Sequence, residues 1–212
     1  MKIPRLYPIL DTATLRRRGI DDWTVVSRAW FSAGAEIIQI RHKPYWTREN
    51  LDQASAIKEQ SDRAATPLII NDRADMAALL KSGLHVGQDD LAPLDCRRVI
   101  GEQTTLGFST HNASQLQAAE NEPIDYLAFG PVFATQSKER PDPLVGLETL
   151  AAARGLTSKP LVAIGGITQE NVQQVFQAGA DSVAVIAGLL PENLTESSLQ
   201  ERMEQWLRLT RQ

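Results

Sequence analysis

Two short apolar segments of this sequence lead into carboxylate side chains. Leu68–Ile70 is followed closely by Asp72, and Leu84–Gly87 is followed closely by Asp90. A charge at the end of a buried strand needs a compensating partner, because an unpaired charge in apolar surroundings carries a large free-energy penalty. We therefore expect Asp72 and Asp90 to share a cation. Two hard oxygen ligands that leave other coordination positions open suit Mg²⁺ bound to a substrate phosphate.

Cationic side chains at other predicted strand ends could bind such a phosphate. Gln39, Arg41 and Lys43 alternate along one predicted strand, so their side chains are expected to share a face. This set suits an anion beside a hydrogen-bonded heterocycle, because guanidinium and ammonium groups bind negative oxygens strongly. Lys138, which follows a later predicted strand, adds a further positive charge.

Glycines and hydroxyl groups indicate a second phosphate position. Gly165–Gly166 and Gly188 follow the last two predicted strands, and glycine lets a ligand approach the backbone amides closely. In α/β barrels, this end of the sheet frequently binds a phosphate group. Thr135 and Ser137 can donate hydroxyl hydrogen bonds to the same group. The whole set implies two phosphorylated substrates, one of them metal-bound.

Each of these residues also has a purely structural interpretation. An aspartate at a strand end is often the N-cap of the next helix, which is the alternative for Asp72. Asp89 is interpreted as structural, and Lys138 taken alone could be a solvated surface charge. Only the convergence of all the residues on one edge favours a site.

A parallel sheet would bring these residues together at the carboxyl ends of its strands. Eight apolar segments alternate with segments of helical periodicity, which predicts parallel strands covered by helices. We predict an α/β fold in which residues 1–212 form a single (β/α)8 TIM barrel, with an open doubly wound sheet as the alternative. The predicted strands are Leu6–Leu10, Glu36–Arg41, Pro67–Asn71, Leu84–Gly87, Leu106–His111, Tyr126–Gly130, Leu161–Gly165 and Ser182–Ala187.

Charge and composition narrow the class of ligand. The net charge is −4 and the pI is about 5.4, so no general attraction to nucleic acid or to an anionic membrane is expected. The single Cys96 cannot form an intramolecular disulfide, and Leu6–Leu10 is too short for a signal sequence. No segment approaches the roughly 20 apolar residues of a membrane helix. We expect a cytoplasmic protein with small-molecule substrates, and a homo-oligomer is compatible with the sequence.

Six motifs in order resemble those of the thiamine phosphate synthase family. The resemblance extends from about Tyr7 to Leu189, which is nearly the whole chain. The motifs are Gln-Ile-Arg-His-Lys at 39–43, Ile-Asn-Asp-Arg-Ala-Asp at 70–75, Gly-Leu-His-Val-Gly-Gln-Asp-Asp-Leu at 83–91, Gly-Phe-Ser-Thr-His-Asn at 107–112, Gly-Pro-Val-Phe-Ala-Thr-Gln-Ser-Lys at 130–138 and Ala-Ile-Gly-Gly-Ile-Thr at 163–168.

The resemblance implies a barrel enzyme that joins 4-amino-2-methyl-5-(diphosphomethyl)pyrimidine to a thiazole phosphate and releases diphosphate. By position, the pyrimidine diphosphate would contact Gln39, Arg41, Lys43, Asn71, Ser109 and Lys138. Asp72 and Asp90 would hold Mg²⁺. The thiazole phosphate would contact Thr135, Ser137, Gly166 and the backbone of Ile186 and Ala187. Arg41, Lys43, Ser109 and Lys138 would be the catalytic residues.

The family chemistry is dissociative, so diphosphate leaves first and the thiazole nitrogen captures a pyrimidine-methyl cation. A site rich in cations, with a metal and no evident nucleophile, fits that chemistry, because leaving-group charge is what needs stabilising. The pyrimidine amino group would supply electrons to the cation.

Two positions depart from the family pattern. The family usually has Glu where this chain has His42, whose side chain should point away from the substrate face. It often has Ser where Ala187 stands, so a hydroxyl is lost at the phosphate end.

Related barrels leave two alternative functions open. Thiazole tautomerases resemble synthases that have lost the diphosphate and metal residues, and they carry His where this chain has Pro131. Asn71, Asp72 and Asp90 favour the synthase. A non-catalytic barrel that binds thiamine precursors is the other alternative, although mere binding would not need both carboxylates and Lys138.

Overall fold

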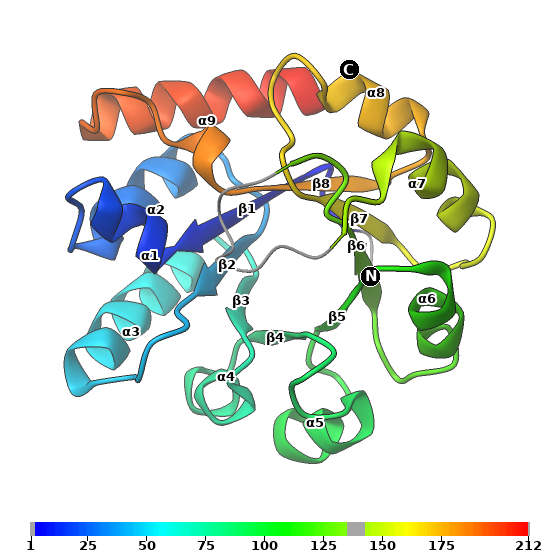
Figure 1. The fold of residues 1–212 in the computed structure, drawn as a ribbon. Helices are drawn as coiled ribbons and strands as arrows, with labels where there is room; N and C mark the ends of the chain where they lie inside the picture. The colour runs from blue at the N-terminus through cyan, green and yellow to red at the C-terminus, as the bar shows by residue number, and fades with distance from the viewer. Residues whose placement is uncertain (1–2, 135–142, 212) are drawn as a thin grey trace.

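The chain forms a closed barrel of eight parallel strands (Figure 1). This computed structural model describes residues 3–134 and 143–211. Each strand pairs in parallel with the next, and β1 pairs with β8 to close the ring. The closure confirms the predicted (β/α)8 barrel and excludes the open sheet. The strands are β1 (Leu6–Asp11), β2 (Ile38–Arg41), β3 (Leu68–Asn71), β4 (Gly83–Val86), β5 (Leu106–Thr110), β6 (Tyr126–Phe129), β7 (Leu161–Ile164) and β8 (Ser182–Val185).

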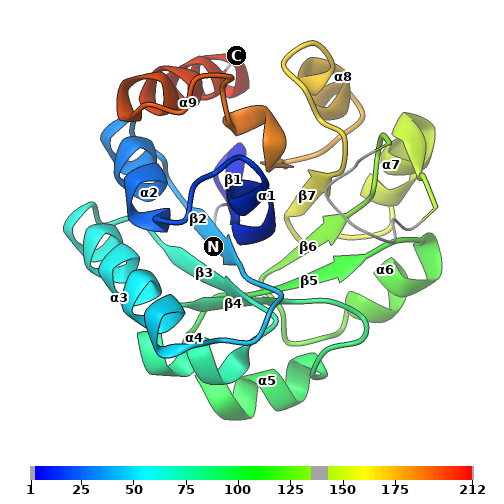
Figure 2. The ribbon, with the colours of Figure 1, turned by 60° about the vertical axis from the view of Figure 1, so that its left-hand side comes forward.

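Helices surround the barrel on the outside, as the view in Figure 2 shows. The longest are α3 and α9, and α9 packs beside α2 and β1. No helix in the described part of the chain is long and apolar enough to cross a membrane. The helices are α1 (Thr12–Arg17), α2 (Trp23–Ser32), α3 (Arg48–Arg63), α4 (Ala74–Leu80), α5 (Pro93–Ile100), α6 (Ala113–Ala119), α7 (Gly146–Arg154), α8 (Val172–Gln177) and α9 (Glu196–Thr210), with a 3₁₀ turn η1 (Ala187–Leu189).

Helix starts differ in how well the sequence marks them. The position of Thr47 before Asn50 and Leu51 predicts a helix start, and Thr47 does cap α3, in a reciprocal arrangement with Asn50. The position of Thr168 before Glu170 and Asn171 likewise predicts a helix start, but this prediction is wrong, because α8 begins four residues later, at Val172. Residues 168–171 instead form a turn, in which the amide of Thr168 donates to Asn171 Oδ1 at 2.8 Å.

Side chains alternate between two cores because the strand period is two. One set points inward and fills the barrel, while the other packs against the helices. Gly83 leaves space inside the barrel for Ile69, whose Cδ1 occupies the place of a side chain on the glycine. The inward set includes Ile3, Tyr7, Ile9, Ile37, Ile69, Tyr126, Ala128, Val162 and Ala184. This apolar plug places the polar residues that follow it at the carboxyl-end mouth of the barrel.

Candidate active site

Asp72 follows β3 in a left-handed backbone conformation. Its φ is +64°, and its amide donates to the carbonyl of His85 on β4 at 2.8 Å. Non-glycine residues rarely adopt this conformation, although aspartate tolerates it better than most. The N-cap of α4 is Arg73, which makes no capping hydrogen bond through its side chain. The N-cap interpretation of Asp72 is therefore wrong, and its side chain is turned toward the barrel mouth instead.

The carboxyl group of Asp72 lies beside Lys43 and Asp90. The Lys43 ammonium forms an ion pair with Asp72, whose side chain is only 17% exposed. Burial raises the pKa of Asp72, Lys43 opposes that rise, and the adjacent Asp90 carboxyl adds to it. Asp90 Oδ2 also accepts from the amide of Gly87 at 2.7 Å. The two carboxylates predicted to share a cation are thus neighbours.

A hollow of about 350 Å³ opens beside this carboxylate pair. Its lining includes Asp72, Arg73, Asp75 and Asp90. Within residues 3–134 and 143–211, no group of three or more His, Cys, Asp or Glu side chains is arranged to hold a metal ion. Two carboxylates fit Mg²⁺ only if the remaining ligands come from substrate or water, which is a usual arrangement for this ion.

Arg41 is held by a carboxylate that the sequence reasoning missed. Arg41 Nη1 donates to Asp11 Oδ2 at 2.5 Å, and Asp11 is almost fully buried at the end of β1. The other oxygen of Asp11 accepts from the amide of Thr14 at 2.8 Å and from its hydroxyl at 2.6 Å. Asp11 therefore fixes Arg41 while it caps α1. The rule that selected Asp72 and Asp90, a buried strand ending at a carboxylate, would also have selected Asp11.

Two buried amides occupy the mouth of the barrel. Gln39 Nε2 donates to Asn71 Oδ1 at 3.4 Å, and both side chains are buried. Their neighbour in sequence, His42, points the other way, as predicted, and packs between Trp23 and Trp46. The alternation along β2 therefore separates a polar inward face from an aromatic outward face.

Ser109 lies at the end of β5 and contacts a histidine. Its Oγ is 2.8 Å from His85 Nε2, and its carbonyl accepts from Gln88 Nε2 at 2.6 Å. His85 is buried inside the barrel, where sequence reasoning assigned it no role. The period-two alternation of β4 could have shown that His85 points inward, toward Ser109.

The glycines after β7 are required by packing against the loop that follows β6. Gly166 has φ +62°, and a side chain there would meet the backbone of Phe133 and Ala134. Gly165 has φ +102° and likewise lies against Pro131. The structure therefore gives these glycines a packing role, and the predicted approach of a ligand to their amides stays a prediction. Because neither glycine has a side chain, the end of β7 packs closely against residues 131–134, which follow β6.

Ile186 and Ala187 lie where β8 passes into η1. Ile186 is half-buried and Ala187 is exposed. Thr135, Ser137 and Lys138 lie outside the described residues.

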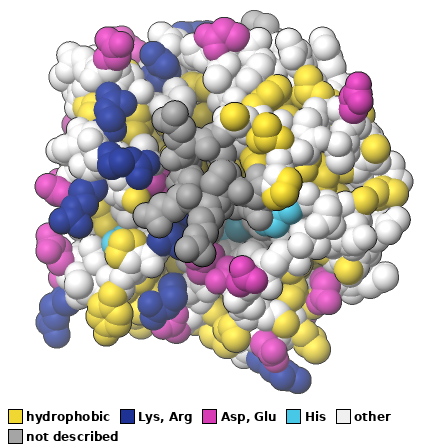
Figure 3. All heavy atoms as spheres, in the orientation of Figure 1, with side chains coloured by type: hydrophobic (Ala, Val, Ile, Leu, Met, Phe, Trp, Pro, Cys, Tyr) yellow, Lys and Arg dark blue, Asp and Glu magenta, His cyan; other side chains and the backbone are white. Residues whose placement is uncertain are grey.

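Figure 3 shows Lys and Arg side chains gathered on the side of the molecule where α1, α2 and α3 lie.

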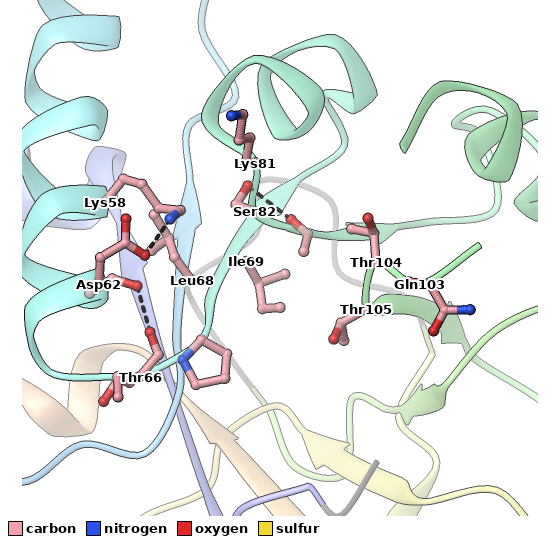
Figure 4. Close-up of a pocket in the computed structure, with 14 residues that line it drawn as sticks. Lys58, Asp62, Thr66, Leu68, Ile69, Lys81, Ser82, Gln103, Thr104 and Thr105 are labelled. Atoms are coloured by element: carbon pink, nitrogen blue, oxygen red, sulfur yellow. Dashed lines mark hydrogen bonds and ion pairs between the residues drawn. The ribbon is translucent and has the colours of Figure 1, made fainter. Parts of the chain in front are cut away.

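A second hollow, of about 410 Å³, lies at the opposite end of the barrel (Figure 4). It opens at the N-terminal ends of β3, β4 and β5, where Lys58 forms an ion pair with Asp62. None of the predicted site residues lines it. The candidate chemistry is therefore confined to the carboxyl end.

The sequence comparisons place the chain among thiamine-phosphate synthases. The sequence profile described as Thiamine monophosphate synthase matches residues 6–189. The thiamine-phosphate synthase of Koribacter versatilis is 50% identical over 192 residues, which is 90% of each chain. That of Chloroflexus aurantiacus is 40% identical over 200 residues, covering 93% of this chain and 91% of the relative. The chain belongs to the thiamine monophosphate synthase family.

The family is one of transferases, so the chain is related to enzymes of thiamine biosynthesis. A solved structure, the thiamine phosphate pyrophosphorylase of Pyrococcus furiosus, matches this fold with a TM-score of 0.82 at 26% identity. The match covers 98% of this chain and 95% of the other. The family that these comparisons show is therefore the one that the six motifs predict.

Proposed function

We propose that the protein joins 4-amino-2-methyl-5-(diphosphomethyl)pyrimidine to a thiazole phosphate, forming thiamine phosphate and releasing diphosphate. The observation that carries the proposal is the carboxylate pair of Asp72 and Asp90 beside Lys43 at the barrel mouth. Family membership supplies the reaction, and the pair supplies a reason for cation-assisted loss of diphosphate. Both proposed substrates are small molecules.

The pyrimidine diphosphate would bind between the buried amides and the cations. Gln39 and Asn71 offer hydrogen bonds to a polar ring, and their burial shields those bonds from water. Arg41 and Lys43 would neutralise the diphosphate together with Lys138, while Ser109 would donate to it. Asp11 keeps the Arg41 guanidinium fixed before substrate arrives, which lowers the entropy lost on binding.

Asp72 and Asp90 would hold Mg²⁺. Because both carboxyl groups are partly buried and lie close together, a shared divalent cation would relieve their repulsion. When bound, the ion supplies positive charge that stabilises the departing diphosphate. Lys43, which pairs with Asp72 in this structure, would then be available to the diphosphate.

The thiazole phosphate would bind at the carboxyl ends of β7 and β8. Gly166 and the backbone of Ile186 and Ala187 border this region, and Thr135 and Ser137 would add hydroxyl donors. The packing of Gly166 against Ala134 supports this placement, because it brings the segment leading to both hydroxyls toward β7.

The reaction needs no protein nucleophile or general base. The bond between the pyrimidine methylene carbon and the diphosphate oxygen breaks, and its electron pair leaves with diphosphate. The thiazole nitrogen then donates its lone pair to the methylene carbon and forms the new C–N bond. No proton is transferred, so the residues act by positioning both substrates and by stabilising leaving-group charge.

The proposal is tested by incubating the protein with both substrates and Mg²⁺ and measuring thiamine phosphate and diphosphate by chromatography. Equal amounts of the two products are expected, and none when either substrate is omitted. Asp90→Ala should abolish turnover, whereas Asp89→Ala, which removes an exposed carboxylate one residue away, should leave it intact. A wild-type protein that forms no thiamine phosphate would refute the proposed function. Normal turnover in Asp90→Ala would refute the metal assignment.

A further inference from the structure

A chain of four polar side chains runs from Ser109 down into the apolar interior of the barrel. Ser109 Oγ lies 2.8 Å from His85 Nε2, and His85 Nδ1 lies 3.0 Å from the hydroxyl of Tyr126. That hydroxyl lies 2.6 Å from the hydroxyl of Tyr7. The four residues come from β5, β4, β6 and β1, so the chain crosses the barrel and depends on its closure.

The interior is shaped to admit this chain. Gly107 faces the middle of it, and a Cβ there would overlap the Tyr126 ring and lie 2.5 Å from His85 Nδ1. The rings of His85 and Tyr126 are stacked, with centroids 5.5 Å apart and planes 27° apart. A residue with any side chain at position 107 would therefore displace the contact between them.

Counting donors and acceptors gives the chain a direction. The hydroxyl of Tyr7 is buried, and Tyr126 is its only hydrogen-bond partner among residues 3–134 and 143–211. A buried O–H group without an acceptor is unfavourable, so Tyr7 must donate to Tyr126. The Tyr126 proton is then directed to His85 Nδ1, which must be unprotonated. His85 Nε2 therefore carries the ring proton and donates to Ser109 Oγ.

The reverse direction fails the same count. If Ser109 donated to His85, then Nδ1–H would donate to Tyr126, and Tyr126 would donate to Tyr7. The Tyr7 proton would then have no acceptor within the described part of the chain. A doubly protonated ring leads to the same result, because it also makes Tyr126 an acceptor from His85. Burial raises the pKa of both tyrosines, which keeps both hydroxyl protons in place.

We propose that His85 and Tyr126 are positioning residues that turn Ser109 into a hydrogen-bond donor directed at the substrate. Because Ser109 Oγ accepts from His85, its own proton is available to an anionic oxygen at the barrel mouth. This inference rests on the proposed function, in which Ser109 contacts the pyrimidine diphosphate. Tyr7 anchors the chain at its buried end.

The direction is tested by ¹⁵N NMR of histidine-labelled protein, which distinguishes protonated from unprotonated ring nitrogens. The sequence has three histidines, and the His85→Gln variant assigns the signals of position 85. The expected result is a protonated Nε2 and an unprotonated Nδ1. A protonated Nδ1 would overturn the inference. This measurement needs no substrate, so it stands even if the proposed function fails.

The positioning role is tested by a double-mutant cycle with Tyr126→Phe and Ser109→Ala. Tyr126→Phe should lower kcat about tenfold, as loss of a partner behind a site residue commonly does. If Tyr126 acts through Ser109, the double variant should be no slower than Ser109→Ala alone. Independent, multiplying losses would overturn the proposal, because a purely structural role predicts them.

Tyr7→Phe is the matched control, since it removes the same atom one link farther from Ser109. Tyr126 can still donate to His85 in that variant, so the His85 tautomer should persist and kcat should fall less than in Tyr126→Phe. A larger loss in Tyr7→Phe would contradict the stated direction. Thermal unfolding of each variant identifies any loss that comes from unfolding.

Discussion

Replacing Asp11 should damage stability and activity by separable amounts. Asp11 caps α1 through its contacts with Thr14 and also pairs with Arg41, whose side chain is 16% exposed. Loss of an N-cap costs about 1 kcal/mol. Loss of one partner from a largely buried ion pair costs roughly 3 kcal/mol. Asp11→Ala should therefore lower the free energy of unfolding by about 4 kcal/mol.

The chain offers a matched control for the capping part. Asp22 caps α2 with the same two contacts, to the amide of Thr24 at 2.9 Å and to its hydroxyl at 2.6 Å. It is exposed and forms no ion pair with the described residues. Asp22→Ala should cost only about 1 kcal/mol. For a chain of this length, the expected falls in Tm are roughly 8–16 °C for Asp11→Ala and 2–4 °C for Asp22→Ala.

The assays are thermal unfolding by circular dichroism and steady-state formation of thiamine phosphate. Asp11→Asn keeps a capping oxygen but loses the charge, so it should be more stable than Asp11→Ala. Its kcat/KM should still fall about tenfold, the loss expected for removing a partner that orients a site residue. Equal falls in Tm for Asp11→Ala and Asp22→Ala would refute the stabilising role of the ion pair. Unchanged kcat/KM in Asp11→Asn would refute the positioning of Arg41.

Three further outcomes are expected. Burial lowers the pKa of His42, against smaller opposing effects of the Tyr45 carbonyl and Asp11. The unfolded chain therefore binds more protons than the folded one, and the free energy of unfolding should fall as the pH drops below about 6.5. Between pH 7 and pH 5, the Tm of His42→Phe should depend less steeply on pH than the Tm of the wild type. Identical slopes for the two proteins would contradict this. Lys138→Ala should lower kcat more than it raises KM in steady-state assays, since leaving-group charge grows in the transition state, and an effect on KM alone would indicate simple binding. Ala187→Ser should tighten thiazole phosphate binding measured by calorimetry, whereas unchanged affinity would show that the backbone suffices.

Local patterns were enough to predict the strands. All eight observed strands begin and end within two residues of the predicted limits, because apolar segments bounded by polar or glycine residues are local signals. The alternation of side chains along a strand correctly predicts that Gln39 points inward and His42 outward, because residues three apart lie on opposite faces. The prediction of a helix start at Thr168 is wrong because the turn there depends on a hydrogen bond that the Thr168 amide donates to Asn171 Oδ1, and periodicity does not show such a bond.

The site was less predictable where it depends on contacts between distant strands. Asp72 and Asp90 were selected correctly as neighbours, whereas the pairing of Asp11 with Arg41 required the register of β1 against β2. The contact of His85 with Ser109 similarly depends on β4 lying beside β5. Neither contact leaves a local mark in the sequence. The roles of Thr135, Ser137 and Lys138 remain predictions, as they lie outside the described residues.

The first strand has a consequence for how the protein reaches its working state. β1 supplies both Tyr7 and Asp11, and it pairs with β8 through Leu6 and Val183, which are far apart in the chain. Contacts between residues so far apart in sequence form slowly, because the entropy of closing a long loop is lost before the contact can stabilise the chain. The supports of Arg41 and Ser109 are thus complete only when the two ends of the chain meet. In a refolding reaction, the return of catalysis would report ring closure, while the return of helical signal would report earlier, local events.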